Sequence, residues 1–389
     1  NANWISVVDA SRNDYDPCVS GSDAAHDASS SYSGAVQAGA GSKAVTIPQS
    51  TLLQDNITYA VCYASGYGNS SDTTWRDSYV RVRISKIETI TAHMVTHRTD
   101  GQIARVGGTY QSWDGSAYQT VDVADLELTY SGSLGNQSWV SLVDQTLNTI
   151  SQGTVSTAPQ PCELGTAAAH EAGSAYSGVS QAPASSKVVT VDTLQMSTSL
   201  TFAVCYAEVS GLSNDTTWAD SGIRLTVSKV TSVEYGEGHS SLPVRTWRST
   251  NIMAATNRLP QVPNAQITYV GDLGSDNWLS VVDASKYTTS SSDFHENNFN
   301  PCVSGTDAAH SATTQYSGAV QAASGTKAVT IPQSALLQDD RTYAVCYAAV
   351  YGNSSDTTWR DSYVRRKISK RETISAHLLA HRTDGQIAR

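Results

Sequence analysis

The stretch Thr-Tyr-Ala-Val-Cys-Tyr-Ala at 58–64 indicates a repeat protein, because it recurs at 342–348 and, as Thr-Phe-Ala-Val-Cys-Tyr-Ala, at 201–207. Successive side chains of a β-strand point to opposite faces of a sheet. The large Tyr, Phe and Val side chains of each copy therefore share one face, and the Cys and Ala side chains share the other. We expect a strand in each copy, with its bulky face toward a core and its cysteine on the outward face.

The residues that lead into this strand carry a second pattern. Leu53 is followed six residues later by Tyr59. This arrangement resembles the tyrosine corner of fibronectin type III and immunoglobulin-like sandwiches, in which the phenol hydroxyl bonds to the backbone just before the strand. The resemblance implies a β-sandwich in each repeat. Phe202 replaces the tyrosine in the middle copy and has no hydroxyl, so we expect that corner to be the loosest.

The three copies predict three domains. The chain has 389 residues, and the repeat divides it into units of about 140, each large enough for a sandwich core. We expect an all-β protein of three tandem immunoglobulin-like β-sandwich modules, with a short helical segment in each and extended β-like connectors between them. The expected bounds are module 1 at 1–95, a connector at 96–122, module 2 at 123–236, a connector at 237–264, module 3 at 265–378 and the start of the next connector at 379–389.

The two ends of the repeat array complement each other. Alternating, strand-like residues precede Trp139 and Trp278, but only three residues precede the matching Trp4, so module 1 is expected to lack its first strand. The residues at 97–105, which lead toward module 2, recur at 381–389. Two interpretations stay open: a chain trimmed from a longer array, or an open sandwich edge in module 1 that a segment of a neighbouring molecule fills by strand donation.

The connectors contain Trp113 and Trp247 together with several apolar residues. Plain disordered linkers lack such residues. We therefore expect extended segments packed on the flanking modules or on adjacent subunits, with flexible linkers as the alternative.

Six cysteines form three regularly spaced pairs. The members of a pair are 44, 43 and 44 residues apart in the three repeats, and no Cys-x-x-Cys motif occurs. This pattern predicts one disulfide per module, formed in an oxidising compartment, with buried free thiols as the alternative. Each bridge should pin a helical segment over the outside of a sheet, whereas the immunoglobulin bridge crosses the core. The pairs are Cys18 with Cys62, Cys162 with Cys205, and Cys302 with Cys346.

Composition excludes several classes of function. The net charge is −10 with 15% charged residues, and roughly a quarter of the chain is Ser or Thr, well above ordinary usage. Nucleic-acid binding requires clustered Lys and Arg, which are absent. No apolar run approaches the length of a transmembrane helix. The surface suits a secreted, glycan-bearing or closely packed protein.

Two recurring groups of polar residues could carry chemistry. A histidine recurs as His26, His170 and His310, but its neighbouring carboxylates vary, so we favour a packing or capping role over a ligand role. An Asp-Thr-Thr-Trp loop begins at Asp72 and ends near Asp77 and could hold calcium, but it lacks the further oxygen ligands that calcium wants, so we favour capping of the last strand. We find no catalytic motif and expect no enzyme, no metal and no cofactor.

Five asparagines begin Asn-x-Ser/Thr sequons, which are acceptors for N-linked glycans. Two of them fall at the same loop of modules 1 and 3, and a third lies two residues along in module 2. Surface loops are accessible to a glycosyltransferase, so this shared position favours glycosylation. The five are Asn69, Asn353, Asn214, Asn56 and Asn136.

These observations predict an extracellular or cell-surface structural protein whose partners are covalent glycans and copies of itself. Modules 1 and 3 are nearly identical and module 2 differs, so two module types alternate. The architecture resembles the repeat proteins of protist surface hairs and of adhesin stalks. The sequence therefore predicts a subunit of a filament, appendage or matrix, and the alternative is a cell-surface carbohydrate-binding adhesin.

Overall fold

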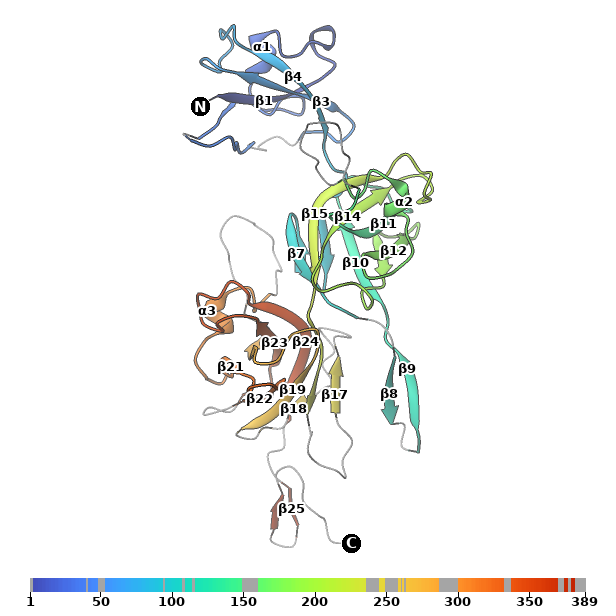
Figure 1. Ribbon diagram of the computed structural model, residues 1–389, viewed down its shortest axis with the longest axis vertical. Coiled ribbons are helices and arrows are strands. Elements are labelled where there is room, and N and C mark those ends of the chain that lie inside the picture. The colour runs from blue at the N-terminus through green and yellow to red at the C-terminus, as the bar shows by residue number, and fades with distance from the viewer. Residues whose placement is uncertain are drawn as a thin grey trace. The chain divides into compact units, whose positions relative to one another are not determined.

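The computed structural model describes most of the chain. It divides into two compact units, unit 1 at Asn1–Lys86 and unit 2 at Ile87–Arg389, each of which is considered by itself (Figure 1). Strands predominate, which confirms the all-β expectation. The described residues are 3–39, 41–47, 53–93, 95–106, 109–113, 116–148, 160–235, 245–248, 258–259, 261, 264–286, 300–331, 337–369, 374–376 and 379–381.

The described part of unit 1 holds one four-stranded antiparallel sheet in the order β2-β1-β3-β4. The repeated stretch at 58–64 forms the inner strand β3 of this sheet. The elements are β1 (Trp4–Asp9), η1 (Asn13–Tyr15), α1 (Gly21–Ala24), β2 (Val36–Gln37), β3 (Thr58–Ala64) and β4 (Arg76–Arg83).

Unit 2 begins with a sandwich of two sheets, here called the second sandwich. Its sheets have the orders β13-β10-β5-β6 and β12-β11-β14-β15-β7, and β8 and β9 pair only with each other among the described strands. The elements are β5 (Thr89–Ala92), β6 (Val95–His97), β7 (Asp100–Ile103), β8 (Thr109–Trp113), β9 (Tyr118–Asp122), β10 (Leu126–Ser131), β11 (Trp139–Asp144), α2 (Gly165–Ala168), β12 (Tyr176–Gln181), β13 (Val188–Val191), β14 (Thr201–Ala207) and β15 (Ala219–Val227).

The third sandwich repeats this plan, with sheets in the orders β17-β16-β19-β22 and β18-β24-β23-β20-β21. Strands β25 and β26 form a separate hairpin. The elements are β16 (Val230–Tyr235), β17 (Arg245–Arg248), β18 (Arg258–Leu259), β19 (Ala265–Gly271), β20 (Trp278–Asp283), α3 (Gly305–Ala308), β21 (Val320–Gln321), β22 (Ala328–Ile331), β23 (Thr342–Ala348), β24 (Arg360–Ile368), β25 (Ile374–Ala376) and β26 (Leu379–His381).

The cores of unit 2 lie between facing sheets. In β10, Leu126, Leu128 and Tyr130 are buried while the residues between them are exposed, as a strand with one face on a core requires. Phe202 of β14 belongs to the same apolar cluster, and its counterpart Tyr343 lies in the core of the third sandwich. The bulky face of the repeated strand therefore points inward in both sandwiches, as expected.

Each sandwich of unit 2 takes strands from the segment that follows the preceding repeat. Strand β5 pairs with β10, and β7 runs parallel to β15 and forms the edge of that sheet. Likewise β16 pairs with β19, and β18 runs parallel to β24. Strand β5 lies within the range 1–95 that the repeat pattern assigned to module 1, and β7 lies within the expected connector 96–122. The connector residues in these strands are thus integral parts of a sandwich.

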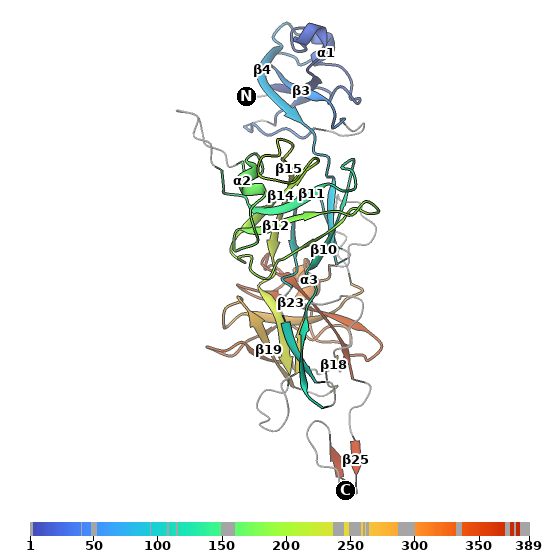
Figure 2. The ribbon, with the colours of Figure 1, turned by 90° about the vertical axis from the view of Figure 1, so that its right-hand side faces the viewer.

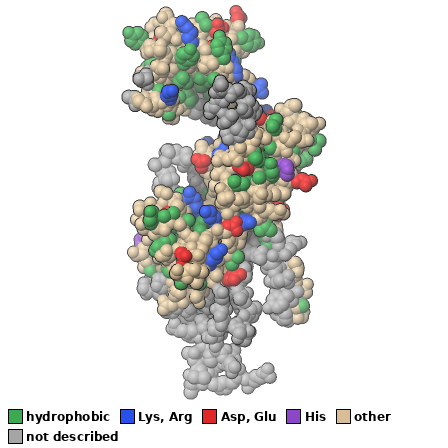
Figure 3. Space-filling view, in the orientation of Figure 1, with side chains coloured by type: hydrophobic (Ala, Val, Ile, Leu, Met, Phe, Trp, Pro, Cys, Tyr) green, Lys and Arg blue, Asp and Glu red, His purple; other side chains and the backbone are tan. Residues whose placement is uncertain are grey.

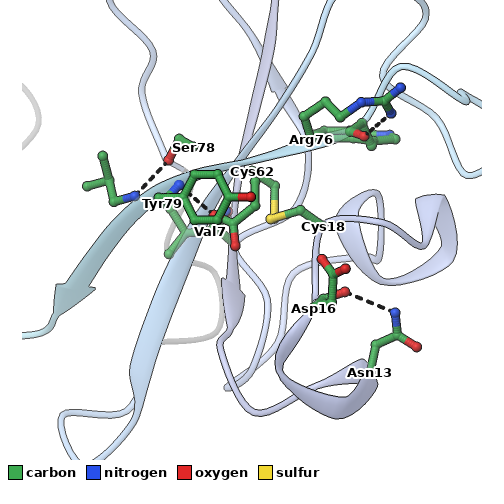
Figure 4. Close-up of a disulfide and its surroundings, with 12 residues drawn as sticks. Val7, Asn13, Asp16, Cys18, Cys62, Arg76, Ser78 and Tyr79 are labelled. Atoms are coloured by element: carbon green, nitrogen blue, oxygen red, sulfur yellow. Dashed lines mark hydrogen bonds between the residues drawn. A yellow bond between two sulfur atoms is a disulfide. The ribbon is translucent and has the colours of Figure 1, made fainter.

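All three predicted disulfides are present, and no described cysteine is free. Cys18 and Cys62 lie in a small buried cluster with Ala24 and Trp75, and Figure 4 shows the bridge between them. A short helix accompanies each bridge, and Figures 1 and 2 both show α2 beside β11. Closing loops of 43 or 44 residues stabilises each repeat by roughly 3–4 kcal/mol in the chain-entropy account.

The tyrosine corner forms in the first and third repeats. In the third repeat, the hydroxyl of Tyr343 accepts a hydrogen bond from the backbone N–H of Gln338 at 2.7 Å and donates one to the backbone oxygen of Thr314 at 2.7 Å. The hydroxyl of Tyr59 makes the same pair of contacts in the first repeat.

The middle corner is closed in another way. Where the hydroxyl is missing, the backbone N–H of Ser197 donates directly to the oxygen of Ser174 at 2.9 Å. These two groups occupy the positions that the hydroxyl bridges in the other repeats. The middle corner therefore keeps its connection, and the expected loosening is offset by a direct backbone bond.

This difference predicts opposite results for two matched substitutions in unit 2. Tyr343→Phe removes a partner from the Gln338 N–H and the Thr314 carbonyl and should lower the free energy of unfolding by about 1–3 kcal/mol. Phe202→Tyr adds a hydroxyl where the backbone groups already bond to each other, so it should not stabilise the unit. Urea unfolding of both variants tests this, and a stabilising Phe202→Tyr would contradict it.

Candidate functional site

The best-defined polar site of unit 2 lies where the third sandwich meets β7 of the second. We call it the junction site, formed by Gln102, Lys229, Tyr347 and Tyr363. The hydroxyl of Tyr363 donates to the backbone oxygen of Gln102. The side-chain amide of Gln102 donates to the hydroxyl of Tyr347 at 2.7 Å, and the N–H of Lys229 donates to the same oxygen at 3.1 Å.

Tyr363 enters the core of the neighbouring sandwich. Its side chain is 1% exposed and belongs to the apolar cluster of the second sandwich. Its ring lies 5.1 Å from the imidazole of His93, measured between centroids. Burial raises the pKa of Tyr363 well above its ordinary value, so the hydroxyl stays protonated and can donate. The tyrosine thus connects the two sandwiches by packing and by a hydrogen bond.

The backbone of β24 holds this tyrosine in an uncommon conformation. Tyr363 has a φ of 61°, a region that bulky residues seldom adopt. Its N–H donates to Asp361 at 2.7 Å, and both oxygens of Asp361 accept hydrogen bonds from Arg365, at 2.8 and 2.6 Å. Asp361 and Arg365 are each only 1% exposed. A buried, bidentate ion pair therefore fixes the local geometry that presents Tyr363.

An exposed ion pair lies beside the junction site. Nη1 of Arg105 is 2.7 Å from Oδ2 of Asp272, and the hydroxyl of Thr198 donates to the same oxygen at 3.1 Å. Arg105 comes from the segment after β7, Thr198 from the second repeat and Asp272 from the third. Because such surface pairs contribute little energy, this contact mainly fixes orientation.

The β5–β7 segment places two histidines beside the junction, of which His97 is buried and His93 is half-buried. Loss of hydration and, to a smaller extent, the nearby Arg365 charge lower the pKa of His93 to about 4. Burial also lowers the pKa of His97 to about 4. Both imidazoles are therefore neutral at pH 7.

Arg366 of β24 stands where the first repeat has Val82, in an otherwise apolar stripe. The stripe alone fits either an edge strand or a different neighbour at this position. Strand β24 pairs with β23 on one side and with β18 on the other, so this end of the strand is not an edge and its second neighbour is β18. Arg366 is fully buried, and loss of hydration lowers its pKa to about 9.

The junction site was not predicted from the sequence. The signal was a substitution at matched positions: Tyr79 and Tyr363 in the first and third repeats stand where the second has Gly222. All three residues have a positive φ, which is common for glycine and rare for tyrosine. A tyrosine kept at a position with a glycine-like backbone indicates a contact beyond its own repeat.

The recurring histidines have packing partners. His26, His170 and His310 each stack on a tyrosine of their own repeat, with ring centroids 4.2, 4.0 and 4.3 Å apart. Each Nδ1 also lies within hydrogen-bond distance of the next residue's carbonyl oxygen. Among the described residues no group of acidic, histidine or cysteine side chains could hold a metal ion.

The Asp-Thr-Thr-Trp loops use their carboxylates as backbone acceptors. Asp72 accepts hydrogen bonds from the N–H of Gly68 at 2.7 Å and from the N–H and hydroxyl of Thr74 at 2.8 and 2.6 Å. These donors lower the pKa of Asp72 to about 2. At the end of the loop Asp77 pairs with Arg81 at 2.7 Å. The described contacts are those of a capped turn.

All five sequon asparagines are exposed. The amide oxygens of Asn69 and Asn353 accept hydrogen bonds from the hydroxyls of Ser71 and Ser355, each at 2.8 Å. The amide nitrogen of Asn136, to which a glycan would attach, instead donates to the carbonyl of Ala184 at 2.9 Å. The first two sites are therefore better placed for modification than Asn136.

Comparison with known proteins does not assign a function to these sites. The chain matches neither a protein-family model nor a curated protein. Within the described residues, no helix has the length and apolar character needed to cross a bilayer.

The junction site predicts unequal effects for two equivalent substitutions. Tyr363→Ala removes a buried aromatic side chain and should lower the free energy of unfolding of unit 2 by about 3–5 kcal/mol. Tyr79→Ala changes a side chain that is 85% exposed and should alter unit 1 by less than about 0.5 kcal/mol in dilute solution. Urea unfolding at low protein concentration measures both, and equal losses would contradict this account.

The lowered pKa values of His93 and His97 predict that the free energy of unfolding of unit 2 falls in acid. The pKa of each is about 4 in the folded state and about 6.5 unfolded. The unfolded state therefore binds more protons, so stability is full above pH 6.5 and falls as the pH drops toward 4. Each histidine contributes up to about 3 kcal/mol to this loss.

Urea midpoints at pH 7 and 4.5 measure the effect, and His93→Gln should reduce the difference. Unit 1 provides a comparison. The pKa of Asp72 is lowered from 3.8 to about 2, so the stability that this carboxylate contributes is lost only as the pH falls from 3.8 toward 2, below the pH range of the test. A unit 2 that keeps its full stability at pH 4.5 would rule out the neutral, buried imidazoles.

Proposed function

We propose that this chain is a structural subunit of an extracellular, glycosylated filament, surface appendage or matrix. Its three immunoglobulin-like modules would stack end to end, and strands from one repeat would complete the sandwich of the next. The observation that carries the proposal is the junction site, where Tyr363 of the third repeat is buried in the core of the second sandwich. Successive repeats with such contacts form a stiff rod more readily than beads on linkers.

The strand pairing supports the same function. Strands β5 and β16 are each drawn from the segment after one repeat into the sandwich of the next. A repeat array of this kind gains stability from neighbour contacts, as other repeat proteins do. The resulting architecture transmits tension along the backbone and across the sheets, which suits a fibre.

The disulfides and the surface support an extracellular location. Three disulfides are typical of an oxidising compartment. On the face shown in Figure 3, tan surface predominates, so uncharged polar side chains and backbone cover most of it. Such a surface can carry glycans or pack closely against copies of itself without strong charge repulsion. We propose no enzymatic activity.

Electron microscopy of negatively stained native material tests the assembly. We expect long filaments, because successive repeats of unit 2 contact each other directly. A cell-surface carbohydrate-binding adhesin is the rival function, and it predicts dispersed molecules that bind defined sugars on a glycan array. Dispersed molecules at high concentration would contradict the filament proposal.

Glycosylation is tested separately by mass spectrometry of intact glycopeptides from native material. We expect glycans on Asn69 and Asn353, which occupy equivalent exposed loops, and a lower occupancy at Asn136, whose amide nitrogen is hydrogen-bonded. Asn56 and Asn214 are exposed as well and provide internal comparisons. Unmodified Asn69 and Asn353 would remove glycosylation from the proposal and leave the assembly untouched.

A further inference from the structure

Unit 1 presents an exposed patch that has a buried counterpart in unit 2. We define the tyrosine face as Tyr63, Asp77, Tyr79, Val80 and Arg81. Tyr79 projects from β4 and is 85% exposed, while Val80 and Tyr63 are 51% and 41% exposed (Figure 4). Three large hydrophobic side chains on neighbouring strands are an unusual feature for an isolated surface.

The same residues recur in the third repeat, where they form the junction. The strand register equates Tyr79 with Tyr363 and Tyr63 with Tyr347, because β3 pairs with β4 as β23 pairs with β24. Tyr347 is 3% exposed and Tyr363 is 1% exposed. Their partner is the β5–β7 segment, through Gln102 and the ring of His93.

The tyrosine face already has the conformation of the buried site. Tyr79 has a φ of 61°, the value found at Tyr363. Its N–H donates to Asp77 at 2.7 Å, and Arg81 donates to both oxygens of Asp77, at 2.9 and 2.7 Å. An exposed tyrosine gains nothing within unit 1 from a backbone conformation that is costly for its side chain. The face is therefore preorganised for a partner.

The chain contains a second copy of the β5–β7 sequence, which is the partner of Tyr347 and Tyr363 in unit 2. Residues 372–389 repeat 88–105 with few exchanges and are identical to it from His381 to Arg389. The counterparts of His93 and Gln102 are His377 and Gln386. The two hairpins also have the same register: Ile374 pairs with His381 as Ile90 pairs with His97. In the second sandwich this hairpin joins β10, whereas β25 and β26 pair only with each other among the described strands.

We propose that the tyrosine face of unit 1 binds residues 372–389 of a second copy of this chain. Tyr79 and Tyr63 would contact Gln386 as Tyr363 and Tyr347 contact Gln102. The contact joins two different surfaces and is therefore heterologous, so it adds chains head to tail instead of closing a symmetric dimer. It rests on the proposed filament and names the two surfaces that join its subunits.

Site-specific photocrosslinking of the full chain tests this pairing. Tyr79 is replaced by p-benzoylphenylalanine, and the variant is mixed with an excess of isotope-labelled wild-type chain before irradiation. We expect crosslinks from residue 79 to labelled peptides within 372–389. The same replacement at Tyr67, which is 80% exposed in another loop of unit 1, is the matched control and should give no such crosslink.

Two other crosslinking results would overturn the proposal. Crosslinks to 372–389 that are confined to the irradiated chain itself would show an intramolecular contact. Crosslinks to β3 or β4 of the second copy would show that two tyrosine faces pack together instead.

Sedimentation velocity supplies an independent measurement on variants that should fold. Tyr79→Ala and Gln386→Ala should each weaken self-association by about tenfold or more, as expected for a central interface tyrosine and its partner, and Tyr67→Ala should not. Undiminished association of Tyr79→Ala would reject this interface while leaving the filament proposal intact. If the wild-type chain stays monomeric at high concentration, both proposals fail.

Discussion

The structure depends on one constraint: the sheet built around the repeated Thr-x-Ala-Val-Cys-Tyr-Ala strand has two faces, and in unit 2 the face opposite the cysteine is covered only in part by strands of its own repeat, such as β10 and β13. The disulfide, the short helix and a tryptophan that recurs in every repeat lie on the cysteine side. In unit 1, Cys18, Ala24 and Trp75 pack there with Cys62. The other face carries Val and aromatic side chains and requires a second sheet. In unit 2 that sheet includes β5 and β16, which follow the preceding repeats in sequence. Burial of the apolar face therefore forces the repeats into contact.

This constraint explains why the junction is specific. Once β7 lies parallel to β15, its Gln102 presents a backbone oxygen and a side-chain amide to the next repeat. Tyr347 and Tyr363 satisfy both, so the polar groups at the contact remain hydrogen-bonded after they lose water. Gly222 at the matching position of the second repeat offers no such side chain. The second and third repeats therefore differ in the side chain that they offer at this position.

The sequence was informative where the signal was local. Alternation in β3 and β10, the cysteine spacing and the Leu53 to Tyr59 corner depend on nearby residues, and the structure confirms the strands and the three bridges. The pairing of β5 with β10 could not be predicted, because a repeat in sequence does not show which neighbour receives a strand. Phe202 suggested a weak corner because the sequence does not show that the N–H of Ser197 donates directly to the oxygen of Ser174. The role of Tyr363 was hidden because an aromatic residue in a strand ordinarily packs within its own sandwich.

The central claim is that the segment after one repeat is structurally part of the next sandwich. Native-state hydrogen exchange, followed on peptides that cover β5 and β7, tests it most directly. If the claim holds, these amides open with nearly the same free energy as those of β10 and β15, because the strands share ladders and a core. Fast exchange of 89–103, at the rate of an unprotected linker while β10 and β15 remain protected, would contradict it.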